Sequence, residues 1–189
     1  MSLLILASQS PRRKELLKKL QIPFQVVASN IDERLFADLP PTDLVVTLAE
    51  QKAKAVSRFY PDSFVIGADT IVTLDNEILG KPSDRQEAKQ MLKRLSGRTH
   101  TVYTGVAVAH KQIVESFIDK TEVTFWEVSE EEIDSYLDSG EPFDKAGAYG
   151  IQGLGALFVQ AISGDYYSVV GLPIARLSRL LTKMGCNAI

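Results

Sequence analysis

The start of the chain contains a strand that passes directly into a helix, and this junction constrains the fold more than any other feature. The apolar run 3–7 reads as a buried strand. Ser10 then suits the N-cap of a helix, and Pro11 suits its first position. The first turn of that helix carries Arg12, Arg13 and Lys14. The sequence therefore predicts a cationic helix start at the end of a buried strand.

Three cations at a helix N-terminus destabilise the helix, because the positive end of the helix dipole lies there. They are favourable where an anion rests on the unpaired N–H groups, as phosphate does in many proteins. The hydroxyls of Ser8 and Ser10 add donors that phosphate oxygens accept. This pattern indicates a phosphate site, with a solvated basic helix start as the alternative.

The rest of the chain alternates strand and helix patterns. Strands are expected at 24–27, 64–72, 77–82, 101–110, 113–128 and 157–159, and helices at 11–20, 42–59, 84–95, 130–137 and 174–184. Capping boxes are expected at Ser83 with Gln86 and at Ser129 with Glu132. The pattern predicts a single α/β domain over residues 1–189, with a central mixed β-sheet flanked by helices.

Composition excludes several classes of protein. With 189 residues and 45% hydrophobic residues, the chain is long and apolar enough to bury a core. A net charge of −3 disfavours a broad nucleic-acid surface. The single cysteine, Cys186, excludes a disulfide framework within one chain and fits a reducing cytoplasm. The run 3–7 is too short for a signal peptide or a membrane span.

Asp69 is the leading catalytic candidate, because it interrupts the apolar run 64–72. A carboxylate buried there is costly without a partner or a metal ion. Gly67 lies on the same face of the strand and leaves space beside it. The alternative is a structural Asp69 that caps a backbone group or pairs with a buried lysine.

The roles of the other charged residues are ambiguous when each is taken alone, but as a group these residues suggest a reaction. Glu33, Lys52 and Lys81 could each be ordinary surface charges. Lys52 and Lys54 lie on different sides of their helix, so one can face a site while the other faces water. As a group, the two arginines and the two lysines could surround phosphate oxygens, while Asp69 and Glu33 hold a divalent cation. This set predicts polyphosphate hydrolysis.

Other catalytic arrangements find no support. His100 and His110 lie ten residues apart in one strand-like stretch, about 33 Å if fully extended, which is too far to share a metal. The sequence contains no P-loop, nucleophile elbow or dinucleotide fingerprint.

Five ordered motifs resemble the Maf family and span nearly the whole chain. They are Ser8-Gln9-Ser10-Pro11-Arg12-Arg13, Gly67-Ala68-Asp69-Thr70, Gly80-Lys81-Pro82, the stretch 145–153 and Val170-Gly171-Leu172-Pro173. The resemblance implies a nucleoside triphosphate pyrophosphatase with an inosine triphosphatase-like α/β fold and a cleft. It also implies frequent homodimers and, for some members, a link to septum formation.

The resemblance also implies roles for individual residues. Asp69 corresponds to the general base and to a metal-site acid, and Glu33 to a second metal-site acid, for Mg²⁺ or Mn²⁺. Phosphate contacts are implied for Ser8, Arg13, Lys52 and Lys81. The implied reaction is attack by water on a nucleotide phosphate, which releases a nucleoside monophosphate and pyrophosphate.

Within the family, Arg12, Thr70 and Gln152 indicate the dTTP/UTP branch. Relatives that resemble 7-methyl-GTP pyrophosphatases carry Trp at the position of Arg12, and an arginine there would repel a cationic methylated guanine. Gln152 offers one donor and one acceptor, which match the edge of uracil or thymine. Two alternatives stay open at this point: a nucleotide- or nucleic-acid-binding regulator of cell division without turnover, and a pyrophosphatase for purine analogues such as ITP.

Overall fold

The computed structural model describes residues 3–186, and its central feature is a 7-stranded mixed sheet. The strand order is β2-β1-β3-β5-β6-β7, and β4 pairs with β3. β1 is parallel to β2 and β3, whereas the β3–β4 and β6–β7 pairs are antiparallel. The strands are β1 (Leu4–Leu6), β2 (Phe24–Val26), β3 (Phe64–Leu74), β4 (Glu77–Leu79), β5 (Thr99–His110), β6 (Ile113–Phe125) and β7 (Val159–Ser163).

Six α-helices and four short 3₁₀ helices occupy the connections in the described part of the chain. They are α1 (Pro11–Lys18), α2 (Pro41–Ser57), α3 (Arg85–Leu95), α4 (Glu130–Asp138), α5 (Tyr166–Val170), α6 (Ile174–Lys183), η1 (Glu33–Phe36), η2 (Glu141–Asp144), η3 (Ala146–Ala148) and η4 (Leu154–Phe158). The expected fold class, a mixed sheet flanked by helices, is confirmed.

Several local predictions are wrong. The strands expected at 77–82 and 113–128 end three residues earlier, at Leu79 and Phe125. The N-cap of α3 is Asp84, whose carboxylate accepts the N–H of Glu87 at 2.8 Å, and not Ser83. Ser83 instead donates its own N–H and hydroxyl to the Glu87 side chain, so Gln86 has no part in the cap. The strand expected at 157–159 begins only at Val159, because the preceding residues form η4.

The chain forms two compact units. Unit 1 comprises Met1–Asp69, Thr104–Asp119 and Gly171–Ile189, and unit 2 comprises Thr70–Tyr103 and Lys120–Val170. The long strands β3, β5 and β6 contribute residues to both units. The single-domain interpretation of the sequence stays a prediction.

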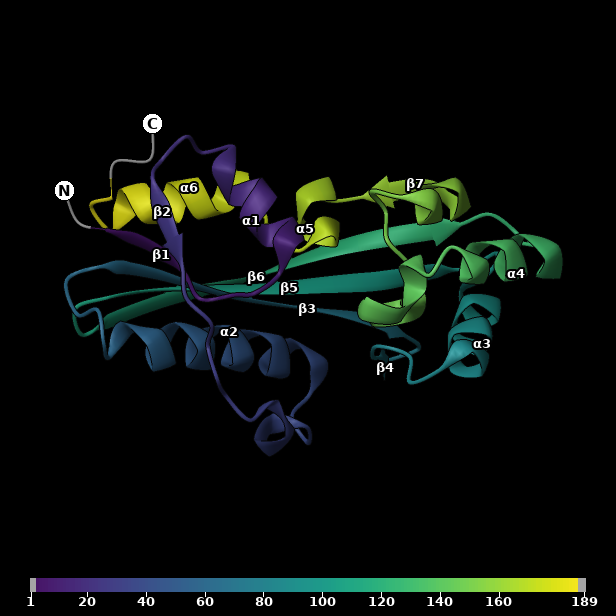
Figure 1. Ribbon diagram of the computed structural model, residues 1–189, viewed down its shortest axis with the longest axis horizontal. Helices are drawn as coiled ribbons and strands as arrows, with labels where there is room; N and C mark the ends of the chain where they lie inside the picture. Colours follow the sequence, from purple (N-terminus) through teal and green to yellow (C-terminus); the bar gives the residue numbers. More distant parts are fainter. Residues whose placement is uncertain (1–2, 187–189) are drawn as a thin grey trace. The chain divides into compact units, whose positions relative to one another are not determined.

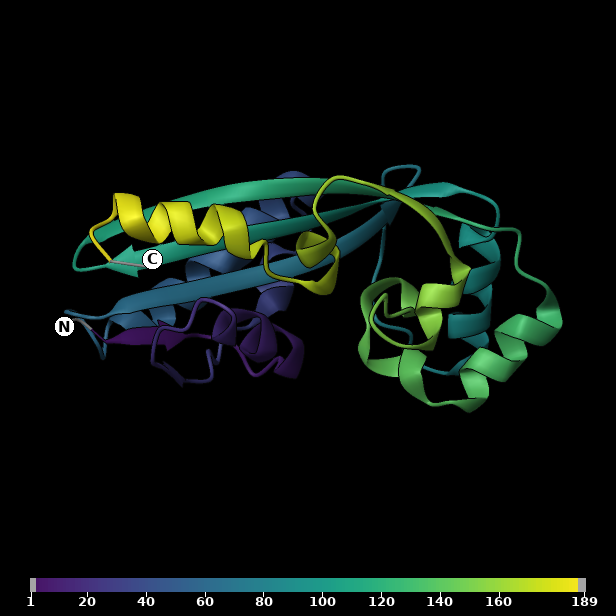
Figure 2. The same ribbon diagram turned by 90° about the horizontal axis from the view of Figure 1, so that it is seen from above.

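In unit 1, α2 covers one face of the sheet, and α1 and α6 lie on the other (Figure 1). Figure 2 shows α6 running along β5 and β6. Two glycines let α2 approach closely. A Cβ built on Gly67 of β3 would lie 2.1 Å from the carbonyl oxygen of Ala49, and one on Gly105 of β5 would lie 2.4 Å from that of Val45. The backbone of α2 therefore rests directly on the sheet, so short side chains of α2 reach β3.

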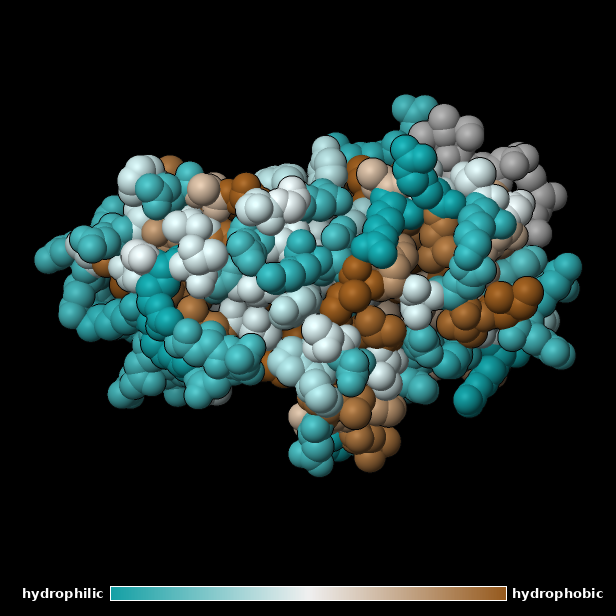
Figure 3. Space-filling view, turned by 180° about the vertical axis from the view of Figure 1, so that it is seen from behind, coloured by the Kyte–Doolittle hydropathy of each residue, from teal (hydrophilic) through white to brown (hydrophobic). Residues whose placement is uncertain are grey.

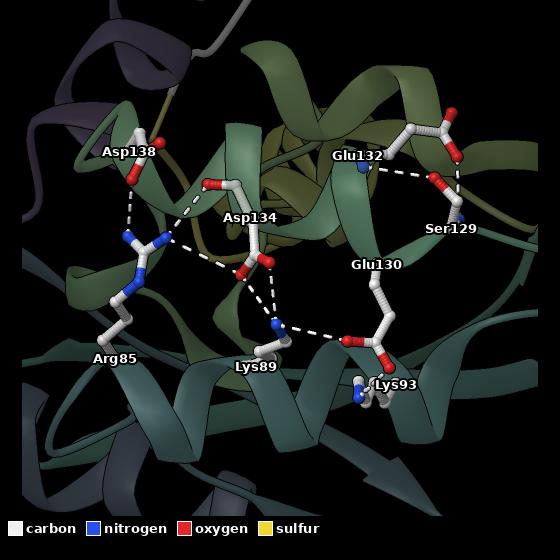
Figure 4. Close-up of polar contacts among 8 residues, drawn as sticks. All are labelled: Arg85, Lys89, Lys93, Ser129, Glu130, Glu132, Asp134 and Asp138. Atoms are coloured by element: carbon white, nitrogen blue, oxygen red, sulfur yellow. Dashed lines mark hydrogen bonds and ion pairs between the residues drawn. The ribbon is translucent and has the colours of Figure 1, made fainter.

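In unit 2, α3 and α4 pack side by side and are joined by ion pairs along their exposed edge (Figure 4). The cations come from α3 and the anions from α4: Arg85 with Asp134 and Asp138, Lys89 with Glu130 and Asp134, and Lys93 with Glu130. Exposed pairs of this kind contribute little individually. The expected capping box of Ser129 and Glu132 at the start of α4 is confirmed.

A buried histidine lies in the core of unit 2. The side chain of His100 is 2% exposed, and its Nε2 lies 2.7 Å from the hydroxyl of Tyr149. Its ring meets Phe125 edge to face, and its Nδ1 has no hydrogen-bond partner among residues 3–186. Burial lowers the pKa of His100 to about 4. His100 is therefore a neutral part of the core at pH 7.

This burial predicts a loss of stability in mild acid. The unfolded chain takes up a proton at His100 near pH 6.5 and the folded chain only near 4, so the free energy of unfolding falls as the pH drops through this window. The full contribution is about 3 kcal/mol. Urea unfolding of the wild type and of His100→Gln between pH 7 and 4.5 measures it. We expect a steeper pH dependence in the wild type, and equal slopes would contradict the neutral assignment.

Candidate functional site

A buried lysine joins two carboxylates within unit 1. The Nζ atom of Lys52 lies 2.6 Å from Oδ1 of Asp69 and 2.8 Å from Oε1 of Glu33. The side chains of Lys52 and Asp69 are only 10% and 13% exposed, whereas that of Glu33 is 55% exposed. Asp69 thus pairs with a buried lysine, as the structural alternative for this residue expected. The pair also makes Asp69 part of a cluster of charges.

The periodicity of α2 explains why Lys52 faces the sheet. Lys52 belongs to the buried stripe of the helix together with Leu48, Ala49 and Val56. Lys54 lies on another side, where it forms a partly exposed i,i+4 pair with Glu50 at 2.8 Å. The prediction that these two lysines face different surroundings is confirmed.

The start of α1 supplies a second cationic element. Ser10 is the N-cap, and its hydroxyl oxygen accepts the N–H of Arg13. Ser8 is buried, and its hydroxyl oxygen accepts the N–H of Ser10 at 3.2 Å. Because β1 and β3 are parallel, with Leu6 opposite Ile66, the chain enters α1 close to the level of Asp69.

Arg13 lies within electrostatic range of the carboxylates. Burial lowers the pKa of its guanidinium, and the positive charge of Arg12 acts in the same direction. The negative charges of Asp69 and Glu33 oppose this shift. The Nε–H group of Arg13 donates to the carbonyl oxygen of Gly171 at 2.8 Å, which fixes the direction of the side chain. Arg12, Arg13, Lys52, Glu33 and Asp69 therefore form one charge cluster in unit 1.

Glu33 reaches this cluster from a weakly packed segment. It is the first residue of η1, which buries none of its residues. Leu35 of η1 is 77% exposed, and Figure 3 shows hydrophobic side chains on the projection that this segment forms. The ion pair between Glu33 and Lys52 ties this segment to α2, although η1 itself contributes no buried residue.

The two carboxylates suit a divalent cation that arrives with its substrate. Glu33 and Asp69 already converge on one cation, the ammonium group of Lys52. Among residues 3–186, no group of three or more His, Cys, Asp or Glu side chains is arranged to hold a metal ion. Mg²⁺ is usually bound by one or two carboxylates plus substrate phosphates and water. The residues present therefore fit this mode of binding.

The other three candidate residues belong to unit 2. Thr70 directly follows Asp69 in β3. Lys81 is exposed just after β4, next to Gly80, whose carbonyl oxygen accepts the N–H of Gly147. Gln152 is exposed in the turn before η4. Their arrangement around Asp69 stays a prediction.

Two residues that orient candidate side chains or loops were not predicted from the sequence. The carbonyl of Gly171 orients Arg13. Gly171 belongs to the motif at 170–173, but this motif is far from Arg13 in the sequence and did not predict the contact. Glu141 had no sequence signal, yet its carboxylate binds the backbone around Gln152.

Comparison with known proteins identifies the family. A family model described as "Maf-like protein" matches residues 3–184. The chain belongs to the Maf family. The resemblance inferred from the five motifs is thus confirmed.

Curated relatives of this Maf-family chain are close in sequence. The dTTP/UTP pyrophosphatase of Bacillus cytotoxicus is 60% identical over 184 residues, which cover 97% of this chain and 96% of that protein. A dTTP/UTP pyrophosphatase of Bacillus cereus is 61% identical over 178 residues, 94% of this chain and 93% of that protein.

A more distant likeness is to a solved structure of a HAM1 protein from Coxiella burnetii. Its sequence identity is 15% and its TM-score is 0.49, over 97% of this chain and all of that one. Among the described helices of the Maf-family chain, none combines the length and apolarity needed to cross a membrane.

Proposed function

We propose that this Maf-family chain is a nucleoside triphosphate pyrophosphatase that hydrolyses dTTP and UTP to the nucleoside monophosphate and pyrophosphate. The observation that carries the proposal is the contact of Lys52 with both Asp69 and Glu33 beside the arginines of α1. The names of relatives about 60% identical over nearly the whole chain support the same activity and the same bases.

The balance of charge in the cluster suits a polyanion. Arg12, Arg13 and Lys52 carry three positive charges, and Glu33 and Asp69 carry two negative charges, which leaves one positive charge in excess. A triphosphate brings several anionic oxygens, and the guanidinium and ammonium groups can bind them by charge-assisted hydrogen bonds. The same cations would stabilise the charge that develops on these oxygens as the anhydride breaks.

We assign to Asp69 the role of proton acceptor. In the proposed reaction, a water oxygen forms a bond to the α-phosphorus, and the water proton passes to Asp69. The bond from the α-phosphorus to the oxygen that bridges it to the β-phosphorus breaks, and this oxygen leaves as part of pyrophosphate. Lys52 holds the carboxylate in place through its contact at 2.6 Å. Because the side chains of Lys52 and Asp69 are buried, bulk water does not compete for their contact.

Glu33 and Asp69 would hold a divalent cation, Mg²⁺ or Mn²⁺, together with the substrate. Such an ion supplies positive charge to the phosphate oxygens and orients the attacking water. The weak packing of η1 allows Glu33 to exchange its contact with Lys52 for a new partner. We place Ser8 and Lys81 among the phosphate contacts.

Base selection is assigned to Arg12, Thr70 and Gln152. The amide of Gln152 can donate to a carbonyl and accept from the N–H of uracil or thymine. The proposed setting is the cytoplasm, which fits the single cysteine, Cys186, a buried thiol. Dimerisation and a link to septum formation stay predictions of the family resemblance.

A panel of nucleotides tests the proposal. Purified protein with Mg²⁺ or Mn²⁺ is incubated with dTTP, UTP, dCTP, ITP and 7-methyl-GTP, and pyrophosphate release is measured for each. We expect the highest kcat/KM for dTTP and UTP. Highest turnover of ITP would favour a purine-analogue enzyme, whereas salt-sensitive nucleic-acid binding without turnover of any nucleotide would favour a regulator.

A further inference from the structure

The carboxylate of Glu141 organises the main chain on both sides of Gln152. Its Oε2 accepts the N–H of Leu154 at 2.9 Å, and its Oε1 accepts the N–H of Gly155 at 3.3 Å. Oε1 also accepts the hydroxyl of Tyr136 at 2.9 Å, and that hydroxyl oxygen accepts the N–H of Gly150 at 3.1 Å. The hydrogen bonds thus hold the chain at 150 and at 154–155, with Gln152 between them.

Glu141 replaces a helix cap that the local sequence cannot provide. The N-cap of η4 is Gly153, which has no side chain to accept the first N–H groups of the helix. Glu141, at the start of η2, supplies the missing acceptor from 13 residues away in sequence. The acceptor is an anion at a helix N-terminus, where it is most favourable.

The glycines of this segment match the position of the carboxylate. A Cβ built on Gly153 would lie 2.2 Å from Oε2 of Glu141. A Cβ on Gly155 would lie 2.6 Å from the carbonyl oxygen of Gly150. The absence of side chains at these positions therefore lets the loop close onto Glu141.

Tyr136 is a second member of this hydrogen-bond network. Burial raises the pKa of its hydroxyl, so the hydroxyl keeps its proton and donates it to Glu141. The backbone carbonyl of Glu141 in turn accepts from Nζ of Lys145 at 2.7 Å. Glu141 is thus held from two sides while its carboxylate holds the loop.

We propose that Glu141 is a positioning residue for base selection: it fixes the backbone of the 150–155 loop, so that Gln152 is presented to the pyrimidine from one position. The proposal rests on the proposed function and on the role of Gln152 in it. A flexible loop would let the backbone of Gln152 move relative to the base, so that its amide would not meet the pyrimidine edge at one fixed place, which would weaken the discrimination of thymine and uracil from cytosine.

A double-mutant cycle tests this role. Wild type, Glu141→Ala, Gln152→Ala and the double variant are assayed for kcat and KM on dTTP and dCTP. We expect Glu141→Ala to reduce the preference for dTTP about 10-fold, mainly through KM, and the double variant to be no worse than Gln152→Ala alone. Glu141→Gln, which keeps one oxygen acceptor, should recover part of the preference.

Glu132→Ala is the matched control in the same unit. Glu132 caps α4 in its capping box with Ser129 and, within residues 3–186, forms no hydrogen bond or ion pair with the loop, so its loss should lower the thermal midpoint and leave the base preference unchanged. Amide hydrogen exchange gives a readout independent of activity: Leu154 and Gly155 should exchange faster in Glu141→Ala than in Glu132→Ala.

Two results would overturn the inference. One is a Glu141→Ala variant that behaves like Glu132→Ala, with a lower thermal midpoint and the wild-type base preference. The other is additivity of the effects of Glu141→Ala and Gln152→Ala on that preference. A wild-type protein without turnover or base preference would instead refute the proposed function, and with it the role of Glu141, before any variant is compared.

Discussion

Asp69→Asn is expected to lower kcat for dTTP by about 1,000-fold while leaving the protein folded. The amide keeps an oxygen that can accept from Nζ of Lys52, so the contact at 2.6 Å can persist, but it cannot take up the proton of the attacking water. It is also a poorer partner for a divalent cation, since it carries no charge. Pyrophosphate release and circular dichroism at pH 7 measure the two parts of this expectation.

Asp75→Asn is the control for this variant. Asp75 directly follows β3, the strand that carries Asp69, and forms an exposed pair with Arg98 at 2.7 Å. Its backbone has a φ of 53°, which asparagine tolerates well. We expect near wild-type kcat for Asp75→Asn. Wild-type kcat for Asp69→Asn would remove Asp69 from the role of base.

Lys52→Met is expected to reduce both stability and activity. Asp69 would keep its buried position but lose the cation that touches it, and breaking a buried ion pair costs about 3 kcal/mol in free energy of unfolding. The kcat/KM for dTTP should fall about 100-fold, because a cation that stabilises the phosphate oxygens is removed. Urea unfolding and steady-state kinetics give the two quantities.

Lys54→Met, on the same helix, separates a local effect from a general one. Its partner Glu50 and its own side chain are partly exposed, so the loss of this pair should cost about 0.5 kcal/mol or less. The double variant Lys52→Met with Asp69→Asn should recover part of the stability lost in Lys52→Met, because no unpaired buried charge is left. Equal stability losses for Lys52→Met and Lys54→Met would contradict the buried pair.

Local sequence signals predicted the parts of the site that depend on near neighbours. Ser10 and Pro11 marked the start of α1, and the apolar run around Asp69 marked a buried carboxylate in β3. The spacing of Lys52 and Lys54 on a helix indicated that they differ in burial, and the structure shows this difference. The N-cap of α3 was misplaced by one residue because Ser83 and Asp84 are both able to cap a helix.

Local sequence signals could not predict contacts between residues that are far apart in the sequence. The close approach of α2 to β5 depends on Gly105, which is far from α2 in the sequence and is unremarkable in its own strand. The carbonyl of Gly171 reaches Arg13 across 158 positions. Glu141 binds the loop through backbone N–H groups, which every residue other than proline carries, so no side-chain pattern reveals the contact. These contacts arise only once the fold brings the segments together.

The identity of the products formed from dTTP tests the central claim most directly. Wild-type protein and Asp69→Asn are each incubated with dTTP and Mg²⁺, and the products are separated by anion-exchange chromatography. We expect the wild type to form dTMP and pyrophosphate in equal amounts and the variant to form almost none. Release of dTDP and inorganic phosphate, or no hydrolysis by the wild type, would contradict the account.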